Sequence, residues 1–269
     1  MFAECKKALW ARRIGLAFVL LVFNFADAHG WGSQGHIVVG YVAEFNLDVA
    51  TKKNIKKEFN INHLADVATW ADMVRKKKEE EKPWHYTNIR EGEWTYEAAR
   101  DCPDGNCVVA KLKEFSGVLA NIENPQEKRK DALKYIVHFV ADVHQPLHLG
   151  NQKDRGGNNI RTYYLGNNVN LHYLWDGGLI HWKNKSLLKY ATRLNSRVTD
   201  SEKLEWLNSN IDEWANESRS YALKFAYPIG ERELTKEYVS RSREILDQRM
   251  VQAGVRLADL LNKIFHSEK

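Results

Sequence analysis

The sequence is poor in cysteine and has no second apolar segment as long as the one near its start. Only three of its 269 residues are cysteines, and the two beyond that first segment are too few for a cysteine-rich structural zinc site. No later stretch approaches the length needed to cross a membrane. Internal repeats, low-complexity tracts and linkers are missing too, which indicates one domain. The net charge of +5 is compatible with a phosphate substrate without being an argument for one.

The first 30 residues have the features of a secretory signal peptide. Lysines and arginines precede an apolar run from Ile14 to Phe25, and small residues follow it. Two cleavage points fit this pattern. One would make His29 the first residue of the mature protein, and the other Trp31. A retained anchor is the alternative. We expect this segment to be removed and residues 31–269 to form the mature domain, secreted or held in the lumen of the secretory pathway.

The two remaining cysteines, Cys102 and Cys107, enclose a turn-forming segment, Pro103-Asp-Gly-Asn106. In an oxidising compartment we expect one local disulfide between them. Asn184 and Asn216 each begin a glycosylation sequon, which the same compartment would permit.

The rest of the sequence has mostly helical periodicity. After a glycine- and asparagine-rich loop at 150–159, Ile160–Leu165 and a stretch from Val169 flank Gly166-Asn-Asn168, which predicts a small β-hairpin. The fold is therefore predicted to be a mainly α, single-domain helical bundle with one hairpin. The expected helices cover residues 35–44, 47–59, 63–74, 93–101, 107–122, 126–143, 185–194, 202–227 and 231–265.

Two lysine-rich stretches fall within or beside these helices. One is a face of the helix expected at 47–59, and the other is the charge run from Arg75 to Lys82 before Pro83. We interpret both as solvated surface, the second as a helix end and loop.

Histidine and aspartate recur at ligand spacing. His138 precedes Asp142 by four residues, and His172 precedes Asp176 by four. Positions i and i+4 share one face of a helix, so each imidazole and carboxylate can converge on one ion. Imidazole and carboxylate are both accepted zinc ligands. With His148 just past a helix-ending proline, these pairs predict a multinuclear metal site.

Six short motifs occur in order across residues 31–180. They are Trp31 with Gly35-His36, Trp70-Ala-Asp72, Trp84-His85-Tyr86, His138-x3-Asp142-x5-His148, Asp154-Arg-Gly-Gly-Asn158 and Asn170-Leu-His172-x2-Trp-Asp176. Together with the signal-like start and the short cysteine pair, they resemble the S1/P1 nuclease family of secreted, zinc-dependent nucleases. The resemblance implies a helical fold of the phospholipase C/P1 nuclease type.

That resemblance implies three zinc ions, with ligands carried over by position. The amino-terminal ligand requires cleavage after Gly30, because only a freed Trp31 amine could bind an ion. We assign Asp72 and Asp142 as the catalytic residues, with Asp142 shared between ions. The implied ligands are Asp72, His85, His138 and Asp142 for the first ion, His148, His172 and Asp176 for the second, and the Trp31 amine and carbonyl with His36 and Asp142 for the third.

The resemblance also implies the reaction and its substrates. A hydroxide activated by zinc would attack phosphorus in line and leave 5′-phosphate ends on single-stranded DNA or RNA, with 3′-nucleotides as further substrates. Tyr86 would stack on an unpaired base. Asn88 stands where fungal members have an aspartate that contacts the base, and Asn158 is the third predicted substrate contact. Arg155 either assists the reaction through its positive charge or stabilises its loop. The glycines beside it either let the backbone come close to a phosphate of the substrate or simply form a turn before the hairpin. We expect a monomer.

Other residues are predicted to have ordinary structural roles. They are His29, His63, His144, His181, His266 and Asp66. Two alternative functions stay open, a zinc-dependent phospholipase C and a non-catalytic secreted zinc-binding protein. Such lipases carry glutamate at the position of Asp176 and need an apolar, membrane-facing mouth, so the nuclease is favoured. Structural zinc sites are usually rich in cysteine, which argues against the non-catalytic alternative.

Overall fold

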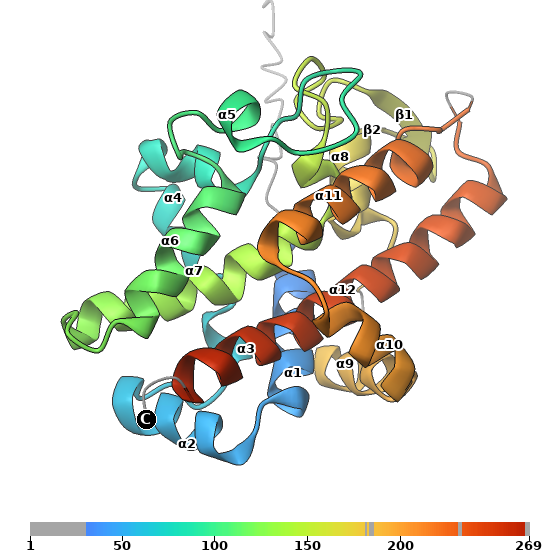
Figure 1. The fold of residues 1–269 in the computed structure, drawn as a ribbon. Helices are drawn as coiled ribbons and strands as arrows, with labels where there is room; N and C mark the ends of the chain where they lie inside the picture. Colours follow the sequence, from blue (N-terminus) through green and yellow to red (C-terminus); the bar gives the residue numbers. More distant parts are fainter. Residues whose placement is uncertain (1–30, 181, 183–185, 231–232, 267–269) are drawn as a thin grey trace, which may run out of the picture.

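The computed structural model describes residues 31–180, 182, 186–230 and 233–266, so the predicted signal peptide, His29, His181 and Asn184 lie outside the described residues. Within this part, helices dominate and the only sheet has two antiparallel strands, which confirms the mainly α prediction (Figure 1). The α-helices are α1 (Ser33–Asn46), α2 (Val49–Phe59), α3 (Leu64–Val67), α4 (Trp70–Arg75), α5 (Ala98–Asp101), α6 (Val108–Ala120), α7 (Gln126–His144), α8 (Leu171–Tyr173), α9 (Leu187–Asn195), α10 (Asp200–Leu207), α11 (Ile211–Tyr221) and α12 (Lys236–His266). The 3-10 helices are η1 (Glu79–His85) and η2 (Pro146–Leu149), the π-helices are η3 (Leu174–Gly178) and η4 (Ala222–Ala226), and the strands are β1 (Arg161–Tyr164) and β2 (Asn167–Asn170).

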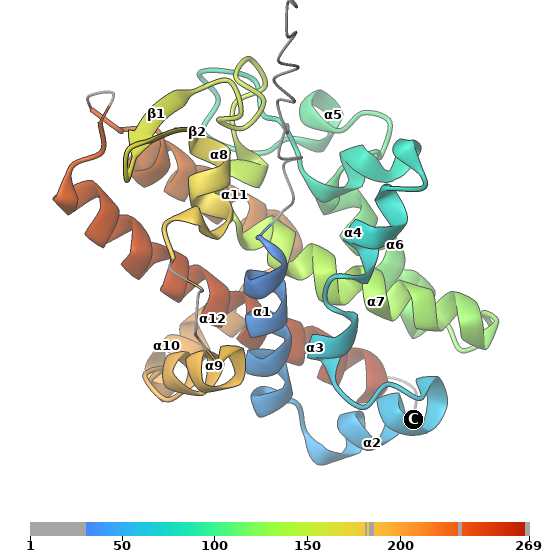
Figure 2. The same cartoon turned by 180° about the vertical axis from the view of Figure 1, so that it is seen from behind.

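Helices α1, α7 and α12 pack together at the centre of the molecule (Figures 1 and 2). The second half of α7 is buried on all sides, which is why its sequence there is apolar except for the predicted ligands and His144. A glycine allows α1 and α12 to approach closely, since a Cβ at Gly254 would lie 2.5 Å from the Val42 side chain. The result is a tight core against which the ligand-bearing segments are fixed.

Two predicted helices are broken in the structure. The stretch 63–74 forms α3 and α4 with Ala68 and Thr69 between them, and the stretch 202–227 is interrupted between α10 and α11. At the second break, Asn210 caps α11 and forms a capping box with Glu213, so side-chain hydrogen bonds satisfy the backbone that a continuous helix would otherwise use. Of the helix predicted at 93–101, only Ala98–Asp101 is helical.

The charge run before Pro83 is mostly solvated, as predicted, because residues 76–80 and 82 are exposed, but two of its residues are buried. It ends within η1, and Glu81 is buried there, where it accepts a hydrogen bond of 2.6 Å from the Tyr135 hydroxyl. Arg75 is buried as well. By contrast, the lysines on the surface of α2 are exposed, as expected.

The hairpin is present with a different turn. β1 pairs with β2 so that Tyr164 faces Asn167, which leaves Leu165 and Gly166 as a two-residue turn. Both have positive φ, 49° and 75°, which is typical of a type I′ turn. Asn167 and Asn168, predicted to lie in the turn, belong to β2 instead.

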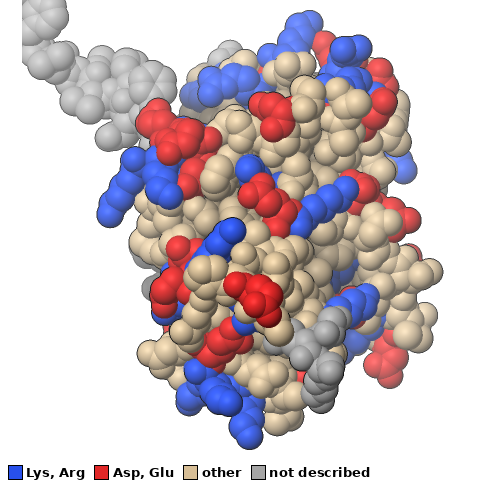
Figure 3. Space-filling view, turned by 60° about the vertical axis from the view of Figure 1, so that its left-hand side comes forward, with Lys and Arg blue, Asp and Glu red and all other residues tan. Residues whose placement is uncertain are grey.

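The described surface has charges of both signs. Figure 3 shows lysines and arginines interspersed with acidic residues and wide neutral areas on the face that it presents. None of the described helices is long and apolar enough to cross a membrane.

Candidate metal centre

Eight of the nine predicted ligand residues contribute side chains to one buried region, and none of the eight is more than 6% exposed. In Figure 2 the first turn of α1 lies against the end of α7, with α4 on one side and α8 on the other. The side chains come from α1 (His36), α4 (Asp72), η1 (His85), α7 (His138 and Asp142), η2 (His148), α8 (His172) and η3 (Asp176).

These side chains form three groups, each with ligand atoms within 4.8 Å of one another. The groups are His36 with His138 and Asp142, Asp72 with His85 and His138, and His148 with His172 and Asp176.

Both pairs with i, i+4 spacing meet as the sequence predicts. His138 Nε2 lies 3.2 Å from Asp142 Oδ2 on α7, and His172 Nε2 lies 3.3 Å from Asp176 Oδ2. The second pair continues from α8 into η3, where Gly177 with φ 124° ends the regular turn. Helical periodicity therefore accounts for both contacts.

Asp142 touches members of all three groups. Its Oδ2 lies 3.0 Å from His85 Nδ1, and its Oδ1 lies 3.5 Å from His36 Nε2 and 3.3 Å from His148 Nδ1. The side chain is completely buried. A single carboxylate is thus within reach of four histidines, counting His138.

The spacing and the unmet hydrogen bonds fit bound metal. Ligand atoms held about 2.0–2.2 Å from a tetrahedral ion are about 3.3–3.6 Å apart, and the separations here fall around that range, from 3.0 Å to 3.9 Å. Buried atoms without a hydrogen-bond partner include both ring nitrogens of His36, His85 Nε2, Asp142 Oδ1 and His148 Nδ1. Unpaired buried polar atoms are costly, so those that face one another in the centre, such as His36 Nε2 and Asp142 Oδ1, are suited to hold a cation.

The charge states of Asp142, His36 and His85 suit ligation. Burial would raise the pKa of Asp142, but His138 and His148 outweigh it and hold that pKa well below its ordinary value, so the carboxylate is ionised. Burial, with a smaller effect of His138, lowers the pKa of His36. Burial also lowers the pKa of His85 to about 4. These two imidazoles are therefore neutral and keep a free lone pair.

Comparison with known proteins agrees with this geometry. Residues 31–266 match the sequence model of the S1/P1 nuclease family. The chain belongs to the S1/P1 nuclease family. It is 30% identical to Endonuclease 2 of Arabidopsis thaliana, over 92% of this chain and 94% of that protein. It is also 30% identical to Nuclease S1 of Aspergillus oryzae, over 88% and 92% of the two chains, and 25% identical to Nuclease P1 of Penicillium citrinum, over 88% and 99%.

In this S1/P1-type chain, further groups orient the predicted ligands, and sequence analysis missed them. The Ala68 carbonyl, freed by the break between α3 and α4, accepts a hydrogen bond of 2.7 Å from His138 Nδ1. Arg75 forms a 2.9 Å ion pair with Asp72, and the Gln145 amide donates to Asp176. Only Arg75 left a signal, its i, i+3 spacing from Asp72. Such partners fix which ring nitrogen of a ligand histidine faces the metal.

The glycine-rich motif beside the centre has a structural role. Arg155, Gly156 and Gly157 have positive φ of 56°, 63° and 83°, and this left-handed turn brings the backbone against His172. The Gly156 carbonyl accepts a hydrogen bond of 2.6 Å from His172 Nδ1. The Arg155 side chain is exposed.

Trp31 is anchored between two ligand-bearing segments. Its indole Nε1 donates to the Ala141 carbonyl at 2.7 Å, one residue before Asp142. The next amide, Gly32 N, donates to the Asp176 carbonyl at 2.5 Å. The ring is fully buried and lies over Gly35, where a Cβ would be only 2.9 Å from the Trp31 Cβ. The start of the described chain is therefore fixed close to Asp142 and Asp176.

Among the described residues, those interpreted as structural are not part of the three groups. His144 is buried two residues from Asp142, donates to the Val140 carbonyl at 2.7 Å and lies 3.0 Å from Arg256. His63 pairs with Glu44 and His266 with Asp48, while Asp66 is exposed.

The three predicted substrate contacts, Tyr86, Asn88 and Asn158, are each close in sequence to a predicted metal ligand or to the loop that contacts His172. Tyr86 and Asn88, which follow His85, are both half-buried, so Tyr86 is not sequestered in the core. Asn158 is half-buried too, and its amide donates to the Arg155 carbonyl at 2.8 Å within the turn.

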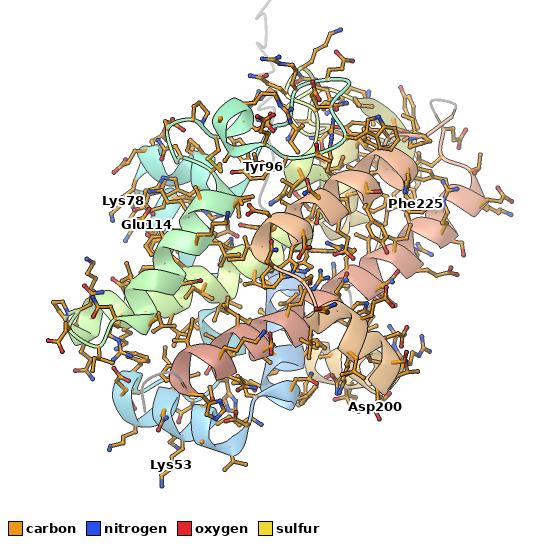
Figure 4. All side chains as sticks on the ribbon, viewed as in Figure 1. Lys53, Lys78, Tyr96, Glu114, Asp200 and Phe225 are labelled. Carbon is orange, nitrogen blue, oxygen red and sulfur yellow. A yellow bond between two sulfur atoms is a disulfide. The ribbon has the colours of Figure 1, made fainter. Side chains whose placement is uncertain are left out.

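The predicted disulfide is present. Cys102 and Cys107 are bonded, with their Cα atoms 5.9 Å apart. The Asn216 side-chain oxygen accepts a hydrogen bond of 2.7 Å from the backbone of Tyr96, a residue labelled in Figure 4 beside α5, so this sequon is partly covered.

Proposed function

We propose that the chain is a zinc-dependent phosphodiesterase that hydrolyses single-stranded DNA and RNA to products with 5′-phosphates and removes phosphate from 3′-nucleotides. Membership of the S1/P1 nuclease family supports a nuclease function. The observation that carries the proposal is the set of three buried histidine and aspartate groups around Asp142.

Three zinc ions would be held by residues of this centre. The carboxylate of Asp142 would be shared by the first and third ions, and Trp31 would ligate through its amine once processing has freed it. The proposed sets are Asp72, His85, His138 and Asp142 for the first ion, His148, His172 and Asp176 for the second, and Trp31, His36 and Asp142 for the third.

Bound zinc would supply an activated water near neutral pH and would stabilise charge on phosphate oxygens. The chain contributes an ionised carboxylate at Asp142 and neutral imidazoles at His36 and His85. Tyr86 offers a partly exposed ring for a base, and stacking on a ring requires that the base be unpaired. Asn88 and Asn158 would contact the substrate through amides, which can donate and accept.

The two alternatives have weaker support. A phospholipase C would need an apolar, membrane-facing mouth, whereas Tyr86 and Asn88, which follow His85 in the sequence, have polar groups and are only half-buried. A purely structural zinc site is usually closed and cysteine-rich, and both cysteines in the described residues form a disulfide.

We also propose that residues 1–30 are a signal peptide and that the domain covers residues 31–269. The mature protein would be a secreted or lumenal monomer, with Asn184 and Asn216 as its glycosylation sites.

The test is hydrolysis of single-stranded DNA by the purified mature protein, with the same sequence as a duplex for comparison. We expect cleavage of the single strand that a chelator abolishes and added zinc restores, with 5′-phosphates on the new ends. A 3′-nucleotide should release inorganic phosphate in the same preparation. A fully zinc-loaded protein that cleaves neither substrate would contradict the proposal, and release of a phosphorylated headgroup from phospholipid would favour the lipase.

A further inference from the structure

The hydroxyl of Tyr227 lies inside the loop that contacts His172. Tyr227 directly follows η4, the continuation of α11 on which Phe225 is labelled in Figure 4, and the end of α11 reaches the loops beside β1 and α8 (Figure 1). The hydroxyl accepts a hydrogen bond of 2.6 Å from the backbone of Asn151 and donates one of 3.0 Å to Asp154 Oδ1. It therefore joins the two ends of the tight segment 151–154.

The Asp154 carboxylate also holds the shape of the turn formed by Arg155, Gly156 and Gly157. Asp154 Oδ1 accepts a hydrogen bond of 2.6 Å from the backbone of Gly157, and its Oδ2 accepts one of 3.2 Å from the Asn151 amide. The Gly156 backbone N donates to the Asn151 carbonyl at 3.0 Å. Between these contacts the Gly156 carbonyl is directed at His172 Nδ1, 2.6 Å away.

We propose that Tyr227 is a positioning residue that holds His172 in the orientation for metal binding, through Asp154 and the Gly156 carbonyl. This inference rests on the proposed function in one respect, that His172 is a zinc ligand. Tyr227 lies in the C-terminal third of the chain, whereas all six sequence motifs lie within residues 31–180.

The physical reason lies in the two ring nitrogens. When Nδ1 donates to the Gly156 carbonyl, the proton stays on that side and the lone pair of Nε2 points toward Asp176, 3.3 Å away. The carbonyl can do this only while the left-handed turn at Arg155, Gly156 and Gly157 keeps its shape. Loss of such an outer partner typically weakens metal binding about 10- to 100-fold.

The hydroxyl is suited to a permanent hydrogen bond. Burial, together with the neighbouring charge of Asp154, raises the pKa of Tyr227 above its ordinary value, so the phenol keeps its proton and continues to donate. The packing around it is tight, since a Cβ on Gly150 would lie 2.8 Å from the Tyr227 oxygen. Phenylalanine would keep the ring and remove only the two hydrogen bonds.

The experiment compares Tyr227→Phe with wild type in the full mature protein, using zinc titration against a chromophoric chelator. We expect one zinc equivalent to bind about 10-fold more weakly, while the others keep their affinity. With Co2+ in place of zinc, the visible absorption of that equivalent should change as well. Tyr221→Phe is the matched control, since that tyrosine lies on α11 and its hydroxyl contacts Gln248 instead of the loop.

A double-mutant cycle tests the route through the carboxylate. If Tyr227 acts through Asp154, the affinity losses of Tyr227→Phe and Asp154→Ala should be less than additive. A Tyr227→Phe protein with a lower Tm but wild-type affinity for every zinc equivalent overturns the inference and leaves the tyrosine as a loop stabiliser. A wild-type protein that takes up no zinc refutes the proposed function itself. That result can be told apart from a Tyr227→Phe variant that binds zinc as the wild type does.

Discussion

At the scale of single residues, Asp142 is the predicted ligand that lies close to the largest number of histidines. Its two oxygens lie within 3.5 Å of nitrogens from four histidines, and no solvent reaches it. Asp142→Asn keeps the volume of the side chain and removes its charge. We expect the variant to lose more than one zinc equivalent and its nuclease activity, because the carboxylate borders all three groups.

Metal content per protein, measured after dialysis, checks this expectation. Asp66→Asn is the control, because Asp66 is an exposed aspartate on α3 outside the three groups. If Asp142→Asn retains the full zinc content, Asp142 is not a shared ligand.

Tyr86 gives a second prediction at this scale. Base stacking on an aromatic ring contributes about 1–3 kcal/mol, so Tyr86→Ala should raise KM for a single-stranded oligonucleotide roughly 5-fold or more while zinc content stays the same. Tyr86→Phe keeps the ring and should behave like wild type. Unchanged kinetics in the alanine variant would mean that Tyr86 does not bind the base.

At the scale of elements, the end of α7 is held by side chains from α11 and α12. The Val143 carbonyl accepts a hydrogen bond of 2.5 Å from the Ser218 hydroxyl, and the His144 carbonyl accepts one of 3.1 Å from Arg249. Arg249 and Arg256 both pair with Glu217, at 2.7 Å and 2.5 Å. Two guanidinium groups are therefore held in the interior by one carboxylate, directly behind the helix that carries His138 and Asp142.

Glu217→Gln should destabilise the fold by removing that carboxylate. Breaking a buried ion pair costs on the order of 3 kcal/mol because the partner charges stay buried, and we expect a somewhat smaller loss here because the Glu217 side chain is 29% exposed. Burial raises the pKa of Glu217, but Arg249 and Arg256 outweigh it and hold that pKa far below its ordinary value. Its contribution to stability is thus fully present above about pH 4.3, the pKa of an unfolded glutamate, and is lost as the pH falls toward the folded-state pKa.

Urea unfolding at a series of pH values measures this contribution. The stability difference between wild type and Glu217→Gln should be large near neutral pH and should shrink below about pH 4. Glu205→Gln, on the exposed surface of α10, should show little difference at any pH. A difference that is independent of pH would mean that charge is not what Glu217 contributes.

At the scale of the whole molecule, the proposed Trp31 ligand would make the metal centre depend on where the mature chain begins. Trp31 is buried and its indole is hydrogen-bonded to the Ala141 carbonyl beside Asp142, while the next residue, Gly32, donates to the Asp176 carbonyl. We expect amino-terminal sequencing of the secreted protein to start at Trp31. A recombinant form that starts at Gly30 should bind about one zinc equivalent less, because its residue 31 nitrogen is an amide without a free lone pair. Equal zinc content in the two forms would show that the Trp31 amine is not a ligand.

The features that could be predicted from the sequence depend on residues close together in the chain. The pairs His138 with Asp142 and His172 with Asp176 meet because helical periodicity alone places residues four apart on one face. The disulfide between Cys102 and Cys107 is likewise a short-range feature. The break between α10 and α11 and the burial of Glu81 were not predicted, because a capping box in one case and a distant partner, Tyr135, in the other outweighed the local pattern.

The sequence by itself determined the helical class, the identity of the predicted ligands and the family to which they point, since these depend on residue type and short spacing. Only the tertiary structure decided how the ligands group around Asp142 and which residues orient them. The Ala68 carbonyl on His138, and Tyr227 acting near His172, join positions that are 70 and 55 residues apart. No local period relates such positions, because their contact follows from how the helices pack against one core.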